Sequence, residues 1–288
     1  MADISAADVK RLREKTGAGI AECKNALVST GGDFPQAEKL LKEKGLAAVE
    51  KRADRAANEG KIFIKVRDDG AQGGAAALVE LASETDFVAR NPEFIALGET
   101  IAGIALEKGY TAPNEALNGM VTDLAAKIRE NMGLKRVAAL NAGPGEYLTS
   151  YIHGDGAIGV AVCLAADTPE ALARDEFKAF AFSLALHIAA FNPMALDRSK
   201  IDAAFLAEQE GIFRKQMEQD PAMEGKNPNV LEGILKGKMK KYLSDICLLD
   251  QGYVKDEKLT VAQALENCGK QLGAKLSVKE YVYFKVGG

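Results

Sequence analysis

Three short stretches of helical hydrophobic spacing occupy the first 45 residues of the chain. Ser5 and Asp33, each followed three residues later by a polar partner, are typical N-caps of helices. Gly17, Gly31 and Gly45 are expected to end the three helices. The apolar positions expected to form a stripe on these helices are Val9, Leu12, Ile20, Cys23, Leu27, Ala37, Leu40 and Leu41. This pattern predicts a small three-helix domain, close to the size limit for independent stability.

A basic, alanine-rich helix is expected over residues 46–58, and a unit of two strands and one helix then occurs twice. Residues 61–66 and 75–81 form the first predicted hairpin, and residues 147–152 and 158–165 form the second. The helix after each hairpin carries apolar residues at the same spacing: Phe94, Leu97, Ile101 and Ile104 in one, Phe177, Phe180, Leu184 and His187 in the other. The repeat predicts a pseudo-twofold core made of two halves.

Outside these two units, the pattern predicts helices and one strand. A helix over residues 121–132 is expected to link the units, with the break Gly143-Pro144-Gly145 as their boundary. Beyond residue 200, two stretches of alternating three and four spacing flank a turn at 220–228 and predict an antiparallel coiled-coil hairpin. Thr260 should cap a short helix, and the alternation over 278–286 predicts a strand that completes the second sheet.

Together these elements predict an α+β fold in five segments. Residues 1–55 hold the three-helix domain and its linker helix, and 56–142 and 143–200 hold the first and second core halves. Residues 201–250 form the helical hairpin inserted into the second half. Residues 251–288 supply the C-terminal helix and strand that complete it.

Composition argues against several classes of protein and site. The formal charge of −4 and the pI near 5.5 argue against a protein that binds DNA or RNA through a strong basic field. The four cysteines are far apart and form no C-x-x-C pair, so neither a zinc site nor a disulfide framework is expected. With no apolar run of membrane-spanning length and no signal-peptide pattern, we expect a cytoplasmic protein.

Sequence motifs for nucleotide or metal chemistry are weak. Residues 233–238 (GILKGK) resemble a phosphate-binding loop, but they have one residue too few between the glycines. Thr16-Gly17-Ala18-Gly19 follows a helix rather than a strand, so it fits a helix-helix corner better than a dinucleotide site. Of the two histidines, His187 is in register with a core position, although a Cys-His nucleophile pair stays an alternative. No cofactor, metal or catalytic residue is expected.

Residues 85–89 (TDFVA) lie between a predicted strand and a helix that opens at Asn91 and Pro92. Phe87 at such a corner has two interpretations. Its ring folds back into the core, as most apolar residues near loops do, or it stays partly exposed as a wedge for another protein.

Three runs of the chain resemble the elongation factor Ts family. They are residues 84–90 (ETDFVAR), residues 13–20 (REKTGAGI) with the nearby pairs at 23–24 and 26–27, and residues 151–154 (YIHG) with 158–160 (IGV). They occur in the order seen in that family, and the resemblance covers nearly the whole chain. It implies a guanine-nucleotide exchange factor that expels GDP from elongation factor Tu.

The resemblance also implies roles for individual residues. Phe87 would enter the GTPase near its magnesium site, Asp86 would hold the displaced backbone, and Thr85 and Val88 would shape the corner. The residues that would dock on the GTPase domain are Lys10, Arg13, Ile20 and Lys24, with Lys51 nearby, and His153 would meet the third domain. The N-terminal domain resembles the ubiquitin-associated type. One factor per GTPase is expected, and dimerisation of that pair stays open.

A second hypothesis is a docking scaffold or chaperone-like protein that uses its three-helix domain and its helical arm without acting on a nucleotide. Such a protein would have no need of the corner at residues 85–89, and this feature separates the two hypotheses.

Overall fold

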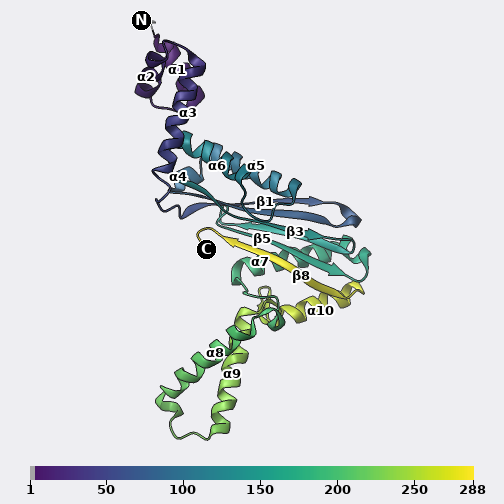
Figure 1. Cartoon of the computed structure of the whole chain (residues 1–288). Coiled ribbons are helices and arrows are strands. Elements are labelled where there is room, and N and C mark those ends of the chain that lie inside the picture. The colour runs from purple at the N-terminus through teal and green to yellow at the C-terminus, as the bar shows by residue number, and fades with distance from the viewer. Residues whose placement is uncertain (1–3) are drawn as a thin grey trace.

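The computed structural model describes residues 4–288, and the predicted α+β class is confirmed. The chain is elongated, with a small helical domain at one end, a layered core in the middle and a two-helix arm at the other end (Figure 1). The core carries the corner at residues 85–89 on the side that faces the helical domain (Figure 1).

The three-helix domain contains α1 (Ala6–Thr16), α2 (Ile20–Ser29) and the start of α3 (Phe34–Glu50). The predicted caps are confirmed, because the side chains of Ser5 and Asp33 accept backbone N–H bonds from Asp8 and Gln36. Its core consists of Val9, Leu12, Ala18, Cys23, Ala26, Leu27, Ala37 and Leu41. Ile20 was predicted to lie on this stripe, but it is 61% exposed because it begins α2 at the domain surface.

The third helix is longer than predicted. It passes through Gly45 and ends at Glu50, so the separate helix expected over residues 46–58 does not exist. Gly45 faces α6 (Glu115–Ile128), and a Cβ at this position would lie 3.1 Å from Cβ of Ala126 and 3.3 Å from its carbonyl oxygen. Glycine therefore serves close helix packing here rather than helix termination.

The first core half is a three-stranded sheet in the order β1 (Glu59–Asp68), β2 (Gly74–Ser83) and β3 (Met132–Ala142). Its outer face is covered by α5 (Pro92–Lys108) and α6, which bury a cluster that includes Phe94 and Ile101. The helix predicted over 121–132 was wrong at both ends, and β3 was not predicted. Arg129 adopts the left-handed conformation (φ 70°), ends α6 and redirects the chain into β3.

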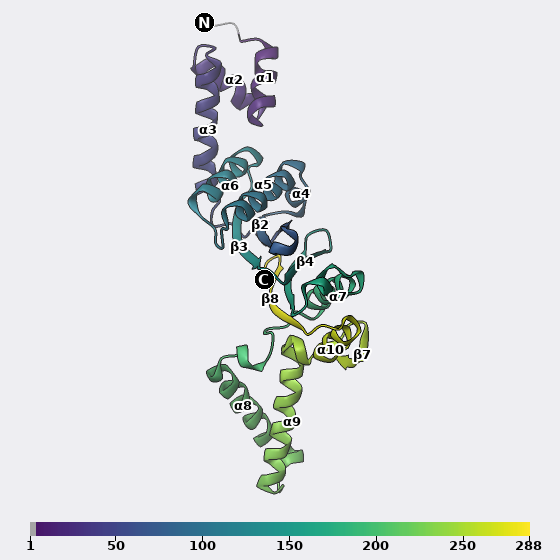
Figure 2. The same ribbon diagram turned by 90° about the vertical axis from the view of Figure 1, so that its right-hand side faces the viewer.

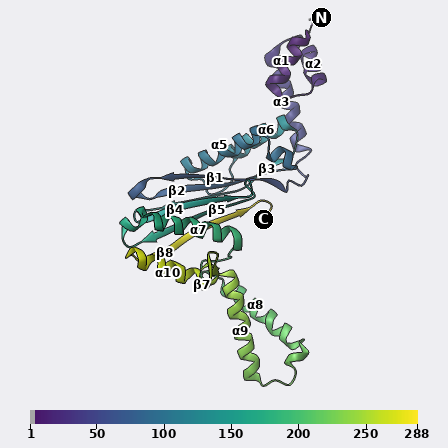
Figure 3. The same ribbon diagram turned by 180° about the vertical axis from the view of Figure 1, so that it is seen from behind.

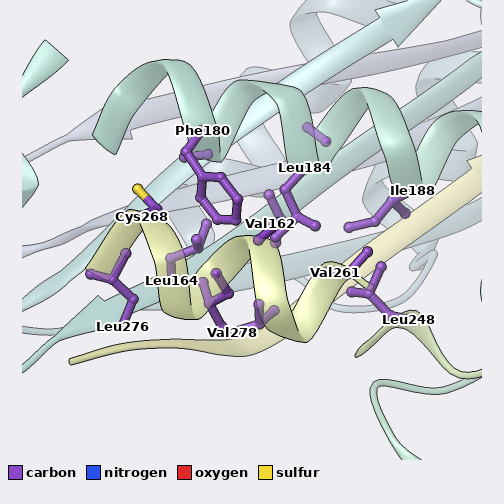
Figure 4. Packing of buried hydrophobic residues seen from close by; sticks show 14 of the residues in the cluster. Val162, Leu164, Phe180, Leu184, Ile188, Leu248, Val261, Cys268, Leu276 and Val278 are labelled. Carbon is purple, nitrogen blue, oxygen red and sulfur yellow. The ribbon is translucent and has the colours of Figure 1, made fainter. Parts of the chain in front are cut away.

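The second core half is a sheet in the order β4 (Glu146–His153), β5 (Ile158–Ala166) and β8 (Leu276–Lys285), which confirms the predicted C-terminal strand. Two helices cover its outer face, α7 (Asp175–Phe191) and α10 (Val261–Leu272), and Thr260 caps α10 as predicted. Figure 4 shows their side chains meeting those of β5 and β8.

The inner faces of the two sheets pack together through residues such as Leu78, Leu140, Cys163 and Phe284. The core is thus a stack of helices, sheet, sheet and helices (Figure 3).

The arm consists of α8 (Ala203–Glu218) and α9 (Pro228–Ile246), joined by a turn, and it projects away from the core (Figure 2). Phe213 and Tyr242 meet edge to face with ring centroids 5.7 Å apart. The arm's buried residues are Met217, Leu235 and Leu243. Its base joins the second core half through β6 (Gly252–Tyr253) and β7 (Asp256–Thr260).

Candidate partner interface

The corner after β2 is a single helical turn, α4 (Asp86–Ala89), with Thr85 as its N-cap. The hydroxyl oxygen of Thr85 accepts a hydrogen bond from the Val88 N–H at 3.3 Å. Val88 and Ala89 are 6% and 5% exposed and pack in the first core half. One face of the turn is therefore fixed to the core, and the opposite face points outward.

Phe87 occupies the outward face. Its side chain is 81% exposed, the largest exposure among the large apolar residues of the described chain, so the interpretation that the ring folds into the core is wrong. Asp86 beside it is partly exposed, and its carboxylate lies 3.2 Å from the guanidinium of Arg90. The ring therefore leaves a large apolar surface open to contact, on a turn whose opposite face is fixed to the core.

Glu130 holds the corner in place, and the sequence analysis missed it. Its carboxylate accepts the Thr85 N–H at 3.1 Å and the Thr85 hydroxyl at 2.9 Å. Glu130 follows Arg129, the C-cap of α6. The left-handed backbone conformation of Arg129 directs the chain after α6 toward the corner. The two partners are 45 residues apart in sequence, so no local pattern could have paired them.

The hydrogen bonds between Glu130 and Thr85 form a brace of the corner, and a second set of contacts beside them, made by Glu84, forms another. The Glu84 carboxylate accepts the Asn131 N–H at 2.6 Å and lies 3.4 Å from the guanidinium of Arg55. The Asn131 side-chain amide donates to the Arg55 carbonyl at 2.6 Å. The corner, the end of α6 and the segment after α3 thus form one hydrogen-bonded unit.

The three-helix domain presents the other predicted partner-binding residues on its surface. Lys10, Arg13 and Lys24 are exposed on α1 and α2, and Lys51 is exposed just after α3. Ile20 and Val28 of α2 are 61% and 56% exposed. The surface of this domain thus carries exposed cations together with exposed apolar side chains.

Contacts with α6 set the position of this domain on the core. Arg129 pairs with Glu22 of α2, and Lys42 of α3 lies 3.0 Å from Asp123 of α6. Its bond to Arg129 lowers the pKa of Glu22. The residue that redirects the chain toward Glu130 therefore also contacts the three-helix domain.

The hairpin of His153 lies at the same end of the core as the corner. Lys61 of β1 is 8% exposed, and its ammonium donates to the Asp155 carbonyl at 2.9 Å and to its carboxylate at 2.5 Å. Lys61 is also paired in register with Leu81, close to the end of β2 from which the corner emerges. His153 is exposed, and its Nδ1 lies 2.9 Å from the Tyr151 hydroxyl.

The second histidine is buried, as predicted. His187 is 0% exposed, its Nε2 lies 2.9 Å from Oε1 of Gln251, and its Nδ1 accepts the Val254 N–H at 3.2 Å. Burial lowers its pKa. Its hydrogen bonds go to Gln251 and the backbone rather than to a thiol, which assigns it to the core.

Within residues 4–288, no group of three or more His, Cys, Asp or Glu side chains is arranged to hold a metal ion. Over the same residues, every helix is too short or too polar to cross a membrane.

Comparison with known proteins places the chain in a family. The family described as "Elongation factor TS" matches residues 84–288, from the corner to the end of the chain. Elongation factor Ts of Treponema denticola is 48% identical over 285 residues, covering 99% of both chains. The proteins of the same name from Treponema pallidum and Borrelia recurrentis are 44% and 41% identical, again over 99% of both chains. The chain belongs to the elongation factor Ts family, and its role is in translation elongation.

Proposed function

We propose that this chain is the guanine-nucleotide exchange factor of elongation factor Tu, with Phe87 as the wedge that enters the GTPase near its magnesium ion. The exposure of Phe87 on a braced turn is the observation that carries the proposal. The chain binds the GDP-bound GTPase and promotes GDP release, and GTP then takes the empty site. It carries out no covalent chemistry of its own.

The energetics of the corner favour this role. Burying a phenylalanine side chain is worth roughly 1.5–3 kcal/mol, and this ring has its burial still available. The turn is held by Glu130 and Val88, so little conformational entropy is lost when the ring is inserted. Asp86 would exchange its contact with Arg90 for backbone groups displaced in the partner.

Magnesium is the target because its charge neutralises much of the diphosphate. A ring that displaces the ion's ligands weakens GDP binding, and GDP in turn weakens binding of the factor, since the coupling between two ligands is reciprocal. Exchange is therefore accelerated while the equilibrium between GDP and GTP stays unchanged.

The remaining contacts would position the wedge. Lys10, Arg13, Ile20 and Lys24, with Lys51 nearby, dock on the GTPase domain, and His153 meets the third domain. Residues 1–55 act as a docking module of the ubiquitin-associated type, 56–142 and 143–200 as the two core halves, 201–250 as an antiparallel coiled coil and 251–288 as the completion of the second half. One factor binds one GTPase in the cytoplasm. Whether two such complexes form a dimer is an open question.

The test is release of a fluorescent GDP analogue from elongation factor Tu at fixed magnesium. Catalytic amounts of the chain should accelerate release, and Phe87→Ala should remove most of the acceleration. Phe191→Ala is the matched control, because this ring is also exposed (47%) but lies at the end of α7. Binding of the GTPase with no acceleration of release would replace the proposal with the docking scaffold.

Magnesium dependence separates a wedge from a simple competitor for GDP. If Phe87 acts on the magnesium site, removing the ion with a chelator should speed GDP release in the absence of factor and shrink the difference between wild type and Phe87→Ala. A difference that is the same at all magnesium concentrations would contradict action at the metal.

A further inference from the structure

The C-terminal end of α6 contacts both the three-helix domain and the corner at residues 85–89. Arg129 ends α6 in a left-handed conformation, and the next residue, Glu130, accepts two hydrogen bonds from Thr85. The side chain of Arg129 extends to the three-helix domain and pairs with Glu22 of α2. Two consecutive residues therefore connect the corner to the domain that carries the proposed docking residues.

Glu22 lies at the start of α2. Besides its bond to Arg129, its carboxylate accepts the N–H of Gly19, the N-cap of the helix, at 3.1 Å. Ile20, the first residue of α2, is exposed next to this cap. The pair of Glu22 and Arg129 thus connects the first turn of α2 directly to the end of α6.

The other contacts between the three-helix domain and α6 are mainly polar. Lys42 of α3 lies 3.0 Å from Asp123, and both side chains are more than half exposed. Among residues 4–288, the buried cluster of this domain and that of the first core half share no residue. A cleft of about 350 Å³ lies between the domain and α6. The orientation of the domain therefore depends on ion pairs in addition to the continuous helix α3.

We propose that Arg129 is a positioning residue of the factor. Through Glu22 it fixes the orientation of the three-helix domain relative to the core, so that the docking residues of α1 and α2 and the ring of Phe87 reach one partner together. The inference rests on the proposed exchange function, because it concerns how the two contact surfaces are presented to that partner. Since α3 already attaches the domain to the core, the pair has to restrain its orientation only, and a contact of modest energy is sufficient for this.

A positioning role predicts a kinetic effect different from that of the wedge. When only a fraction of the factor has the orientation that binds, its apparent affinity is reduced by that fraction. Loss of the ion pair should therefore raise the concentration of factor that gives half-maximal GDP release. The maximal rate should stay unchanged, because Glu130 still holds the corner and Phe87 is intact.

Two substitutions break the pair from opposite sides. Glu22→Gln removes the charge and keeps an amide oxygen for the N–H of Gly19. Arg129→Asn removes the guanidinium, and asparagine tolerates the left-handed conformation of this position. Each should raise the half-maximal concentration about threefold to fivefold, the range of a well-formed exposed ion pair, and the double variant should lose no more than either single variant.

Two further variants serve as references for this exchange assay. Arg129→Lys keeps the positive charge and should lie between the wild type and Arg129→Asn. Lys270→Gln is the matched control, because it breaks an exposed ion pair of the same kind, with Glu266 at 2.6 Å, on α10 of the second core half. It should change neither the half-maximal concentration nor the maximal rate.

The orientation itself is measured on the full chain without a partner. Spin labels at Val28→Cys in α2 and Glu107→Cys in α5 report the distance between the domain and the core, since both positions are exposed and the four native cysteines are buried. Double electron–electron resonance should give one narrow distance distribution in this labelled parent. Adding Glu22→Gln or Arg129→Asn should broaden it.

The two measurements together decide the proposal. An unchanged distance distribution, additive losses in the double variant, or a broadened distribution with an unchanged half-maximal concentration would each overturn it. A chain that does not accelerate GDP release at all would refute the exchange function instead. In that case the distance measurement would still show whether Arg129 and Glu22 fix the orientation of the domain.

Discussion

Replacing Glu130 with alanine tests whether the corner is held by the contact that the structure identifies. The substitution removes the acceptor of the Thr85 N–H (3.1 Å) and of its hydroxyl (2.9 Å) and touches no part of the Phe87 ring. A hydrogen bond to a charged group contributes about 1.5–3 kcal/mol, and because this pair is partly exposed and both bonds share one carboxylate, we take the loss of the two bonds together as that of one bond at the lower end of this range. We expect Glu130→Ala to lower the free energy of unfolding by about 1.5 kcal/mol.

The effect on exchange follows from the same energy. A corner that has lost about 1.5 kcal/mol of restraint populates other conformations, so up to about a tenfold loss in the rate of GDP release is expected. Urea unfolding gives the stability, and release of fluorescent GDP gives the rate. Glu130→Gln, which keeps one acceptor oxygen, should fall between the wild type and Glu130→Ala.

The control for this prediction is Glu107→Ala. The Glu107 side chain is 74% exposed, and its only ion pair within residues 4–288 is with its neighbour Lys108 at 3.4 Å, so its loss should change neither quantity. If Glu130→Ala leaves both stability and exchange at the level of Glu107→Ala, the reasoning about the brace is refuted.

Three further predictions concern the core. Lys61→Met should lower the urea midpoint of unfolding, because the carboxylate and the carbonyl of Asp155 lose their shared donor; an unchanged midpoint would contradict this. Burial lowers the pKa of His187 below 6.5, so the unfolded chain binds this proton more tightly. Stability should therefore fall as pH decreases below 6.5, by at most about 1.4 kcal/mol per pH unit, and His187→Gln should remove that part of the slope in urea titrations. Burial and the neighbouring Glu146 raise the pKa of Cys163 to about 12. A thiol reagent at pH 8 should therefore label Cys163 slowly in the native chain and rapidly in urea, and fast labelling of the native chain would contradict the burial of this thiol.

Local signals were sufficient for several features of the fold. Ser5, Asp33 and Thr260 are N-caps in the structure because a short polar side chain before a helical pattern satisfies free backbone N–H groups. The alternation near the C-terminus predicted β8, which pairs with β5, the central strand of the second sheet. Phe87 is a different case: its position at a strand-to-helix corner left both a buried and an exposed ring open, and the structure shows the ring exposed.

Strand β3 was missed because its burial pattern is irregular. A bulge opposite the Glu80–Leu81 step shifts the register, so Leu81 pairs with Leu134 and Glu80 with Arg136. The buried positions Leu134 and Val137 are consequently three residues apart, a spacing typical of a helix.

Gly45 and Glu130 show a different limit. A glycine inside a helix costs about 1 kcal/mol relative to alanine, so its role in packing against Ala126 becomes visible only when both helices are placed. Glu130 meets Thr85 only because Arg129 adopts a left-handed conformation that is uncommon outside glycine, asparagine and aspartate. Both features depend on tertiary contacts, which the spacing of residues along the sequence does not predict.

The measurement that tests the central claim most directly compares wild type and Phe87→Ala in two quantities with elongation factor Tu. These are the rate of GDP release at saturating factor and the affinity for the nucleotide-free GTPase. If the ring's burial energy is used to disturb the magnesium site, the rate should fall about tenfold to a hundredfold, and the affinity should fall much less. Equal losses in rate and affinity would contradict the account, since they would make Phe87 an ordinary binding contact.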